Sequence, residues 1–190
     1  MYAREGMGAS IDDVIAAAEV SRGTFYNYFR TPEELISAVG DTLLKELIDF
    51  VEGASVPIDD PVLRIATGVR LFLHAARQHP LFATFIWRAG FTSTSALALL
   101  QVYFPRHVQS GIDAGVLKIA DPAMGVHIIG GIGLAATYAL STQKVGEDYP
   151  EQITRQALLA LGATARHADK AIASLLPPLQ FPEGSLLGRT

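Results

Sequence analysis

The sequence contains no cysteine among its 190 residues, which excludes disulfide bonds, thiolate metal sites and cysteine nucleophiles. It also lacks an excess of basic residues, because 15 Lys and Arg stand against 19 Asp and Glu, a net charge of −4. This balance excludes a protein that coats nucleic acid non-specifically, but it allows a small DNA-binding module on an acidic body. With 49% hydrophobic and only 18% charged residues, the chain is expected to form its own core.

Further absences exclude other classes of protein. The opening residues MYAREGMG lack the apolar core of a signal peptide, so a cytoplasmic protein is expected. There is no phosphate-binding loop, no G-x-S-x-G motif and no H-E-x-x-H motif, which indicates that the protein is not an enzyme. The five histidines do not follow the spacing of metal ligands, so we expect no metal site, and we predict no cofactor.

Apolar residues recur at helical spacing along almost the whole chain, and no stretch alternates with the period of a strand. An all-α protein of eight or nine helices is therefore predicted. Capping residues, prolines and glycines place these helices at residues 11–18, 22–29, 32 to a break at 53–57, 61–78, 80–90, 93–115 with a possible kink at Pro105, 122–142 and 150–176. The tail PPLQFPEGSLLGRT is predicted to be an irregular strap or a frayed end.

The longest uncharged stretch runs from Ala123 to Leu140 and is at the lower limit of a membrane span. An integral membrane protein is therefore one alternative. A buried helix is favoured, because Asp121 and Pro122 form a soluble-type helix start and no Lys/Arg cluster flanks the stretch. Together with the apolar residues Leu158, Leu159, Leu161 and Ala165 of the last helix, this stretch predicts a two-fold, four-helix subunit interface.

Residues 11–29 have the layout of a helix-turn-helix: a short helix, a three-residue turn and a second short helix, RGTFYNYF. The second helix of this motif enters the major groove of DNA. Arg22 is suited to a guanine edge or a phosphate, Asn27 is suited to a base edge, and the hydroxyls of Thr24, Tyr26 and Tyr28 are suited to phosphate oxygens.

The run IDDVIAAAEVSRGTFYNYFRTPEELISAV resembles the DNA-binding region of TetR-family transcriptional repressors. The resemblance implies an all-α homodimer with an amino-terminal helix-turn-helix module, followed by a larger helical ligand-binding and dimerisation domain. These two domains are expected at residues 1–48 and 49–190. The resemblance further implies a palindromic double-stranded DNA operator, and DNA contacts by Ser10, Ser21, Arg22, Gly23, Thr24, Tyr26, Asn27 and Tyr28.

The sequence departs from the family pattern in three ways. Of the first family helix, the chain is expected to keep only Met1 to Arg4, so that the module is truncated at its start. Glu19 occupies the position of a turn glycine, and Pro32 that of a phosphate-contacting lysine. Residues 1–45 carry four basic and seven acidic side chains, a net charge of −3 that is a poor electrostatic footprint for DNA.

Aromatic residues gather on three consecutive predicted helices, between residues 72 and 104. Two interpretations stay open: an ordinary core, or a pocket for a small apolar or aromatic effector. The pocket is predicted among residues 60–115, closed on one side by the helix that begins at Pro122. The predicted ligand contacts are Phe72, Phe85, Trp87, Phe91, Tyr103 and His107, and Gln101, Arg88 and His127 are further polar candidates.

The sequence thus favours a homodimeric repressor that a small ligand releases from its operator. The alternative is a helical ligand-binding or scaffolding protein that no longer binds DNA, which the acidic first 45 residues favour.

Overall fold

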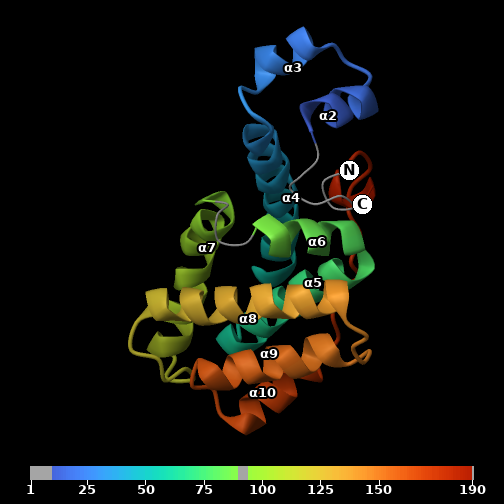
Figure 1. Ribbon diagram of the computed structural model, residues 1–190. Helices are drawn as coiled ribbons and strands as arrows, with labels where there is room; N and C mark the ends of the chain where they lie inside the picture. Colours follow the sequence, from blue (N-terminus) through green and yellow to red (C-terminus); the bar gives the residue numbers. More distant parts are fainter. Residues whose placement is uncertain (1–9, 90–93, 190) are drawn as a thin grey trace.

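The computed structural model describes residues 10–89 and 94–189 of the chain. Over these ranges the protein is all-helical, as predicted, with nine α-helices and no strand (Figure 1). The helices are α2 (Ile11–Ala18), α3 (Arg22–Tyr28), α4 (Pro32–Ser55), α5 (Pro61–Gln78), α6 (Pro80–Ala89), α7 (Thr94–Asp113), α8 (Pro122–Thr142), α9 (Tyr149–Ala160) and α10 (Ala165–Ile172), and a 3₁₀ turn, η2, covers Leu187–Arg189.

Local capping sets the starts of the main helices. The side chains of Ser10, Thr31, Asp60 and Asp121 each accept a hydrogen bond from a backbone N–H in the first turn that follows. In three of these four helices proline is the first residue, where its missing N–H costs no hydrogen bond. The sequence predictions for these starts are confirmed.

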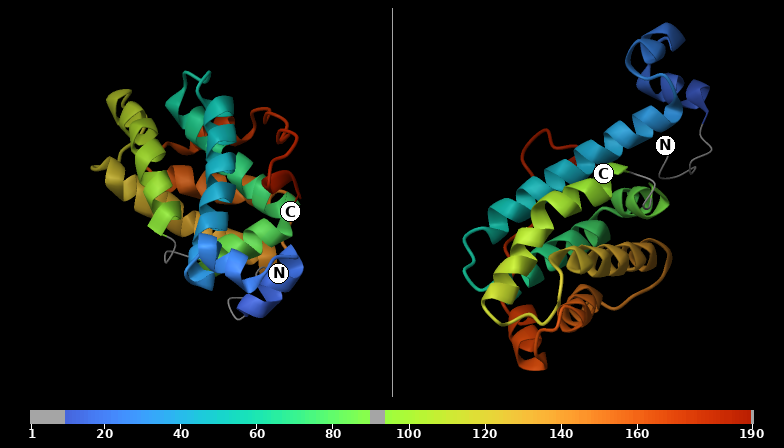
Figure 2. Two further views of the ribbon diagram at one scale, coloured as in Figure 1. Left: turned by 90° about the horizontal axis from the view of Figure 1, so that it is seen from above. Right: turned by 90° about the vertical axis from the view of Figure 1, so that its left-hand side faces the viewer.

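The helices form a small module and a larger body. Figure 1 shows α2 and α3 at one end of the molecule, with the rest of the helices gathered at the other. The long helix α4 leaves the small module and continues along the body, as the side view in Figure 2 shows. The predicted domain boundary between residues 48 and 49 falls inside α4, which is unbroken there.

Two clusters of buried residues hold the body together. One joins α5, α7, α8, α9 and α10 and includes the fully buried Leu73, Leu158 and Leu161. The other joins α4, α5, α6 and the carboxy-terminal tail and includes Leu47 and Phe82. Since Leu158 and Leu161 lie in the core of a single chain, the prediction that these two residues form a subunit interface is wrong, whereas Leu159 is only partly buried and Ala165 is exposed.

Two helix boundaries differ from the predictions. The expected single helix over residues 150–176 is two helices, because Gly162 has a φ of 84°, which is not helical. A Cβ at this position would lie 2.6 Å from the backbone nitrogen of Lys118, so only glycine fits there. The expected break at Gly53 does not occur, and α4 continues to Ser55. Helix α7 continues through Pro105.

The carboxy-terminal tail is a strap against α4. The Glu46 carboxylate accepts hydrogen bonds from the backbone nitrogens of Leu186 and Leu187 at 3.2 and 3.1 Å, and from the Ser185 hydroxyl at 2.8 Å. The Leu187 side chain is fully buried among residues of α4 and α6. Of the two alternatives for the tail, the structure therefore shows the strap.

Helix α8 is long and apolar enough, by length and composition, to cross a membrane, and it is the one such helix within the described ranges. It packs against α5, α6, α7 and α9, and Figure 1 shows it beside α9. In the single chain only 33% of its apolar window is buried. Helix α8 is therefore an integral part of the bundle that still presents much of its surface outward.

Candidate DNA-binding surface and ligand cavity

Helix α3 has one buried face and one exposed face. Phe25 is buried and contacts the rings of Tyr26 and Phe29, with centroid separations of 5.5 and 5.9 Å. Ser21 begins the helix by accepting a hydrogen bond from the backbone nitrogen of Thr24 at 3.0 Å. This anchoring fixes the direction of α3 and leaves its polar side chains toward the outside.

All eight residues predicted to contact DNA are exposed. Seven of them lie in α3 or at its cap, and Tyr28 is the most exposed of the large side chains there, at 78%. The eighth, Ser10, caps α2 and forms a reciprocal pair with Asp13, whose carboxylate accepts from the Ser10 backbone nitrogen at 2.9 Å. Hydrogen bonds from Ser10 hold the pKa of Asp13 below its ordinary value. The DNA contacts themselves stay a prediction.

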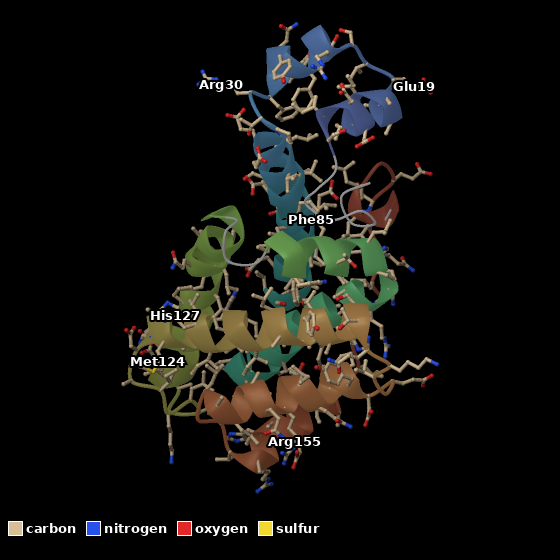
Figure 3. All side chains as sticks on the ribbon, in the orientation of Figure 1. Glu19, Arg30, Phe85, Met124, His127 and Arg155 are labelled. Carbon is tan, nitrogen blue, oxygen red and sulfur yellow. The ribbon has the colours of Figure 1, made fainter. Side chains whose placement is uncertain are left out.

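The one basic residue of α3 is held by an acidic neighbour. The Arg22 guanidinium donates a hydrogen bond to the Asp12 carboxylate on α2, and both side chains are exposed. Arg22, which was predicted to reach a base edge or a phosphate, is therefore engaged by Asp12 in the protein without DNA. Arg30, in the linker between α3 and α4, extends away from the module (Figure 3).

The turn between α2 and α3 carries backbone strain at Glu19. Glu19 has a φ of 54°, the left-handed region that glycine adopts without cost, and it is the one non-glycine residue with positive φ among those described. This geometry explains physically why glycine would suit the position. Figure 3 shows Glu19 at the end of α2.

Glu19→Gly is therefore expected to raise the free energy of unfolding by about 1 kcal/mol, because the left-handed conformation no longer strains a side chain. Thermal unfolding monitored by circular dichroism measures the change. Glu19→Gln removes the charge but keeps the Cβ, so it serves as the control and should show no such gain. Equal stabilisation by both variants would attribute the effect to charge instead of strain.

The body contains a cavity of about 190 Å³. Residues from five helices line it, with the largest shares from the carboxy-terminal half of α4 and from α5. The lining residues are Leu44, Leu47, Ile48, Val51, Glu52, Ser55, Arg64, Ile65, Gly68, Val69, Phe72, Ile86, Leu100, Tyr103, Phe104, His107, Ile129, Gly130, Gly133 and Leu134. The wall is mostly aliphatic and aromatic, which is the usual character of a small-molecule site.

Three of the six predicted ligand contacts line this cavity: Phe72, Tyr103 and His107. Phe85 and Trp87 lie elsewhere. Phe85 is buried against Gly40, and a Cβ added to Gly40 would lie 2.7 Å from the Phe85 ring. Trp87 packs edge-on against Tyr138, with ring centroids 4.9 Å apart. Phe91 falls outside the described residues.

Two of the further polar candidates, Gln101 and His127, are not among the lining residues. Gln101 and His127 are exposed, and the Arg88 side chain is outside the described part of the structure. Three polar residues that were not predicted do line the cavity: Glu52, Ser55 and Arg64. Because Gly53 was expected to end the helix, the last turns of α4 were not considered as a wall of the pocket.

The chain matches two family descriptions. Residues 1–39 match "Bacterial regulatory proteins, tetR family", and residues 60–174 match "Tetracyclin repressor-like, C-terminal domain". The HTH-type transcriptional regulator EthR of Mycolicibacterium smegmatis is 35% identical over 83 residues, 43% of this chain and 36% of EthR, so the match spans little more than a third of that relative. The uncharacterized HTH-type transcriptional regulator YhgD of Bacillus subtilis is 25% identical over 140 residues, 67% of this chain and 72% of YhgD.

Solved structures share the fold over nearly the full length. The crystal structure of RolR without ligand has a TM-score of 0.78 and 22% identity, covering 94% of both chains. RolR in complex with resorcinol has a TM-score of 0.75 and 21% identity, covering 94% of this chain and 90% of RolR. Since the carboxy-terminal match alone covers more than half of the chain and the amino-terminal match covers the helix-turn-helix, the protein belongs to the tetR family of bacterial helix-turn-helix transcriptional regulators and is not an enzyme.

Proposed function

We propose that this regulator is a homodimeric repressor that binds a palindromic operator through α3 of each subunit and is released by a small apolar or aromatic ligand in the cavity. Two recognition helices in successive major grooves would stand about 34 Å apart. A cytoplasmic location, close to the chromosome, belongs to this proposal.

The exposed face of α8 supports the homodimer. An outward stripe of the helix recurs at helical spacing and consists mainly of small or apolar residues: Met124, His127, Gly131, Ala135, Tyr138 and Thr142. Met124 and Tyr138 are 52% and 44% exposed in the single chain. Helix α9 lies beside α8, so together they offer a two-helix surface that a second copy would complete as a four-helix bundle (Figure 1).

Helix α4 carries the proposal, because it connects the two sites within one element. Helix α4 begins at Pro32, after a short linker from α3. Its carboxy-terminal half contributes six cavity residues: Leu44, Leu47, Ile48, Val51, Glu52 and Ser55. A ligand that fits one position of α4 better than another would shift the population of conformers and with it the separation of the two α3 helices. Figure 2 shows the length of this helix.

Fluorescence anisotropy with labelled DNA from the region that flanks the coding sequence tests the proposal. We expect tighter binding than to a scrambled duplex of equal length, a loss of affinity between about 50 and 200 mM salt, and release by an aromatic compound. Resorcinol is the first compound to test, since a protein of similar fold binds it. Equal affinity for both duplexes at both salt concentrations would contradict operator binding.

The acidity of the module supports the second candidate, a helical ligand-binding protein that no longer binds DNA. The Asp12–Arg22 ion pair is the observation that favours this candidate, because the Asp12 carboxylate binds the guanidinium that would otherwise contact DNA. Release of Arg22 from Asp12 distinguishes the two candidates.

Asp12→Asn is expected to tighten DNA binding by roughly threefold to tenfold, since it frees Arg22 and removes a charge that repels phosphate. The matched control is Glu33→Gln, which removes one acidic charge from the first turn of α4 but leaves the Asp12–Arg22 pair intact. Anisotropy titrations at low salt measure both. An equal gain in the two variants would show that net charge alone, and not the pairing of Arg22, limits affinity.

A further inference from the structure

The polar residues of the cavity gather at one end. Glu52 and Ser55 lie three residues apart on the same face of α4, Arg64 is on the second turn of α5, and His107 reaches the site from α7. Elsewhere the wall consists of aliphatic, aromatic and glycine residues. A ligand would therefore meet an apolar surface over most of its area and polar groups at one end.

The contact between Glu52 and His107 defines the chemistry at this end. The Nε2 atom of His107 lies 2.8 Å from Oε1 of Glu52, and the Arg106 guanidinium donates to the other carboxylate oxygen. Since an ionised carboxylate only accepts hydrogen bonds, Nε2 of His107 carries the hydrogen. In the neutral ring Nδ1 is then an acceptor.

Two buried polar atoms beside this pair have no hydrogen-bond partner in the described part of the chain. They are Nδ1 of His107 and Oγ of Ser55. Both residues line the cavity, and they are only 8% and 3% exposed. Buried polar groups are nearly always paired, so an unpaired acceptor and an unpaired hydroxyl on two residues that line one cavity point to a partner that is absent from the protein itself.

We infer that the cavity binds a neutral, single-ring compound that carries a hydroxyl group, and that this hydroxyl donates to Nδ1 of His107 and accepts from Oγ of Ser55. The inference rests on the proposed function and specifies its ligand class. A hydroxyl can donate and accept at once, as these two atoms require. The cavity volume of about 190 Å³ suits one ring with small substituents, because a cavity of about 150 Å³ holds benzene.

Calorimetric titration of the full chain with phenol, toluene and benzoate tests the inference. Toluene replaces the hydroxyl of phenol with a methyl group of similar size, so the ratio of the two affinities measures recognition of the hydroxyl. We expect phenol to bind at least about fivefold more tightly than toluene, since a hydrogen bond to a buried group is worth close to a factor of ten. Benzoate is expected to bind more weakly than phenol, because the Glu52 carboxylate lies at the polar end.

Ser55→Ala is expected to lower the preference for phenol over toluene by roughly fivefold, and His107→Leu to lower it similarly, while toluene affinity changes by less than about twofold. Ser110→Ala, one turn after His107 on α7 and outside the cavity lining, is the matched control and should leave both affinities unchanged. Thermal unfolding checks that His107→Leu folds. Ser55→Ala removes one atom and keeps the test decisive if His107→Leu does not fold.

Several outcomes would overturn the inference. Toluene binding as tightly as phenol would show that the hydroxyl is not recognised. Benzoate binding most tightly would show that the polar end recognises an anion, through Arg64, instead of a hydroxyl. Absence of binding by all three compounds would overturn it as well. Operator anisotropy on the same samples separates this inference from the proposed function: DNA release by another compound, without phenol binding, would refute the ligand class alone. Phenol binding that depends on Ser55 but leaves the affinity for DNA unchanged would support the ligand class and refute the release mechanism.

Discussion

Gly131→Glu on α8 is expected to lower operator affinity by about 10²–10⁴-fold by separating the two subunits of the proposed dimer. A dimer places two recognition helices on one duplex, so binding of the second half-site is intramolecular and gains an effective concentration that a monomer lacks. A carboxylate in the middle of the mainly small or apolar α8 stripe would lose its hydration in the dimer, and that cost favours separate chains.

Gly131 suits this test because the single chain tolerates a side chain there. The residue is exposed, and a Cβ built on it meets no atom within 4 Å. The glycine is also in a helix interior, where a glutamate is intrinsically more favourable by roughly 0.5–1 kcal/mol. A loss of DNA binding by Gly131→Glu therefore cannot be ascribed to a damaged fold.

The matched control is Gly53→Glu on α4, where a Cβ likewise meets no atom within 4 Å. It adds the same charge to another exposed helical glycine, outside the α8 stripe. Light scattering after size exclusion reports the mass of each variant, and anisotropy reports its operator affinity. Gly131→Glu should be monomeric and weak in DNA binding, and Gly53→Glu should match the parent protein. A Gly131→Glu variant that remains dimeric would place the subunit interface elsewhere.

The sequence predicts those features of this protein that depend on neighbouring residues. Helix starts at Ser10, Thr31 and Asp121 are correctly predicted because capping is decided within one turn. The helix-turn-helix is equally local, since Phe25 and Phe29 share a face by their spacing alone and contact each other in the structure.

Features that depend on distant contacts are not predictable in this way. Glu52 and His107 are 55 residues apart and meet only because α4 packs against α7. At the break between α9 and α10, Gly162 lies so close to the backbone of Lys118 that no side chain fits, and no periodicity of the two helices reveals this contact. Phe85 and Trp87 are aromatic residues of predicted helices, as Phe72 is, and the sequence does not distinguish them. Only the packing of the helices shows that Phe72 lines the cavity and that Phe85 and Trp87 do not.

Arg70→Met is expected to lower the free energy of unfolding by about 3 kcal/mol, the largest change in stability expected from one substitution in the body. The Arg70 guanidinium on α5 donates to the Glu151 carboxylate on α9 at 3.3 Å and to the carbonyl of Ser174 at 2.9 Å. Its side chain is only 8% exposed. Removal of the arginine leaves the partly buried Glu151 carboxylate with His74 as its remaining partner, and it leaves the Ser174 carbonyl without its arginine donor.

The matched control is Arg155→Met. Arg155 on α9 pairs with Asp169 on α10 at 2.6 Å, but these side chains are 32% and 56% exposed, so the loss should stay below about 1 kcal/mol. Urea unfolding monitored by circular dichroism gives both free energies. Adding Glu151→Leu to Arg70→Met removes the carboxylate that has lost its arginine partner and should recover part of the loss. Equal losses in the two single variants would show that burial does not set the strength of these ion pairs.

The pH dependence gives an independent check on the same network. Burial raises the pKa of the Glu151 carboxyl, but the hydrogen bond and charge of His74, together with the Arg70 hydrogen bond, outweigh it and hold the pKa below its ordinary value of 4.5. A carboxyl with a lowered pKa in the folded state contributes stability that is present above its ordinary pKa and lost as the pH falls through the folded value. The stability difference between the parent protein and Arg70→Met should therefore be largest near neutral pH and shrink below pH 4.5. A difference that persists unchanged in acid would mean that Arg70 stabilises the body through its contact with Ser174 and its packing, and not through the charge of Glu151.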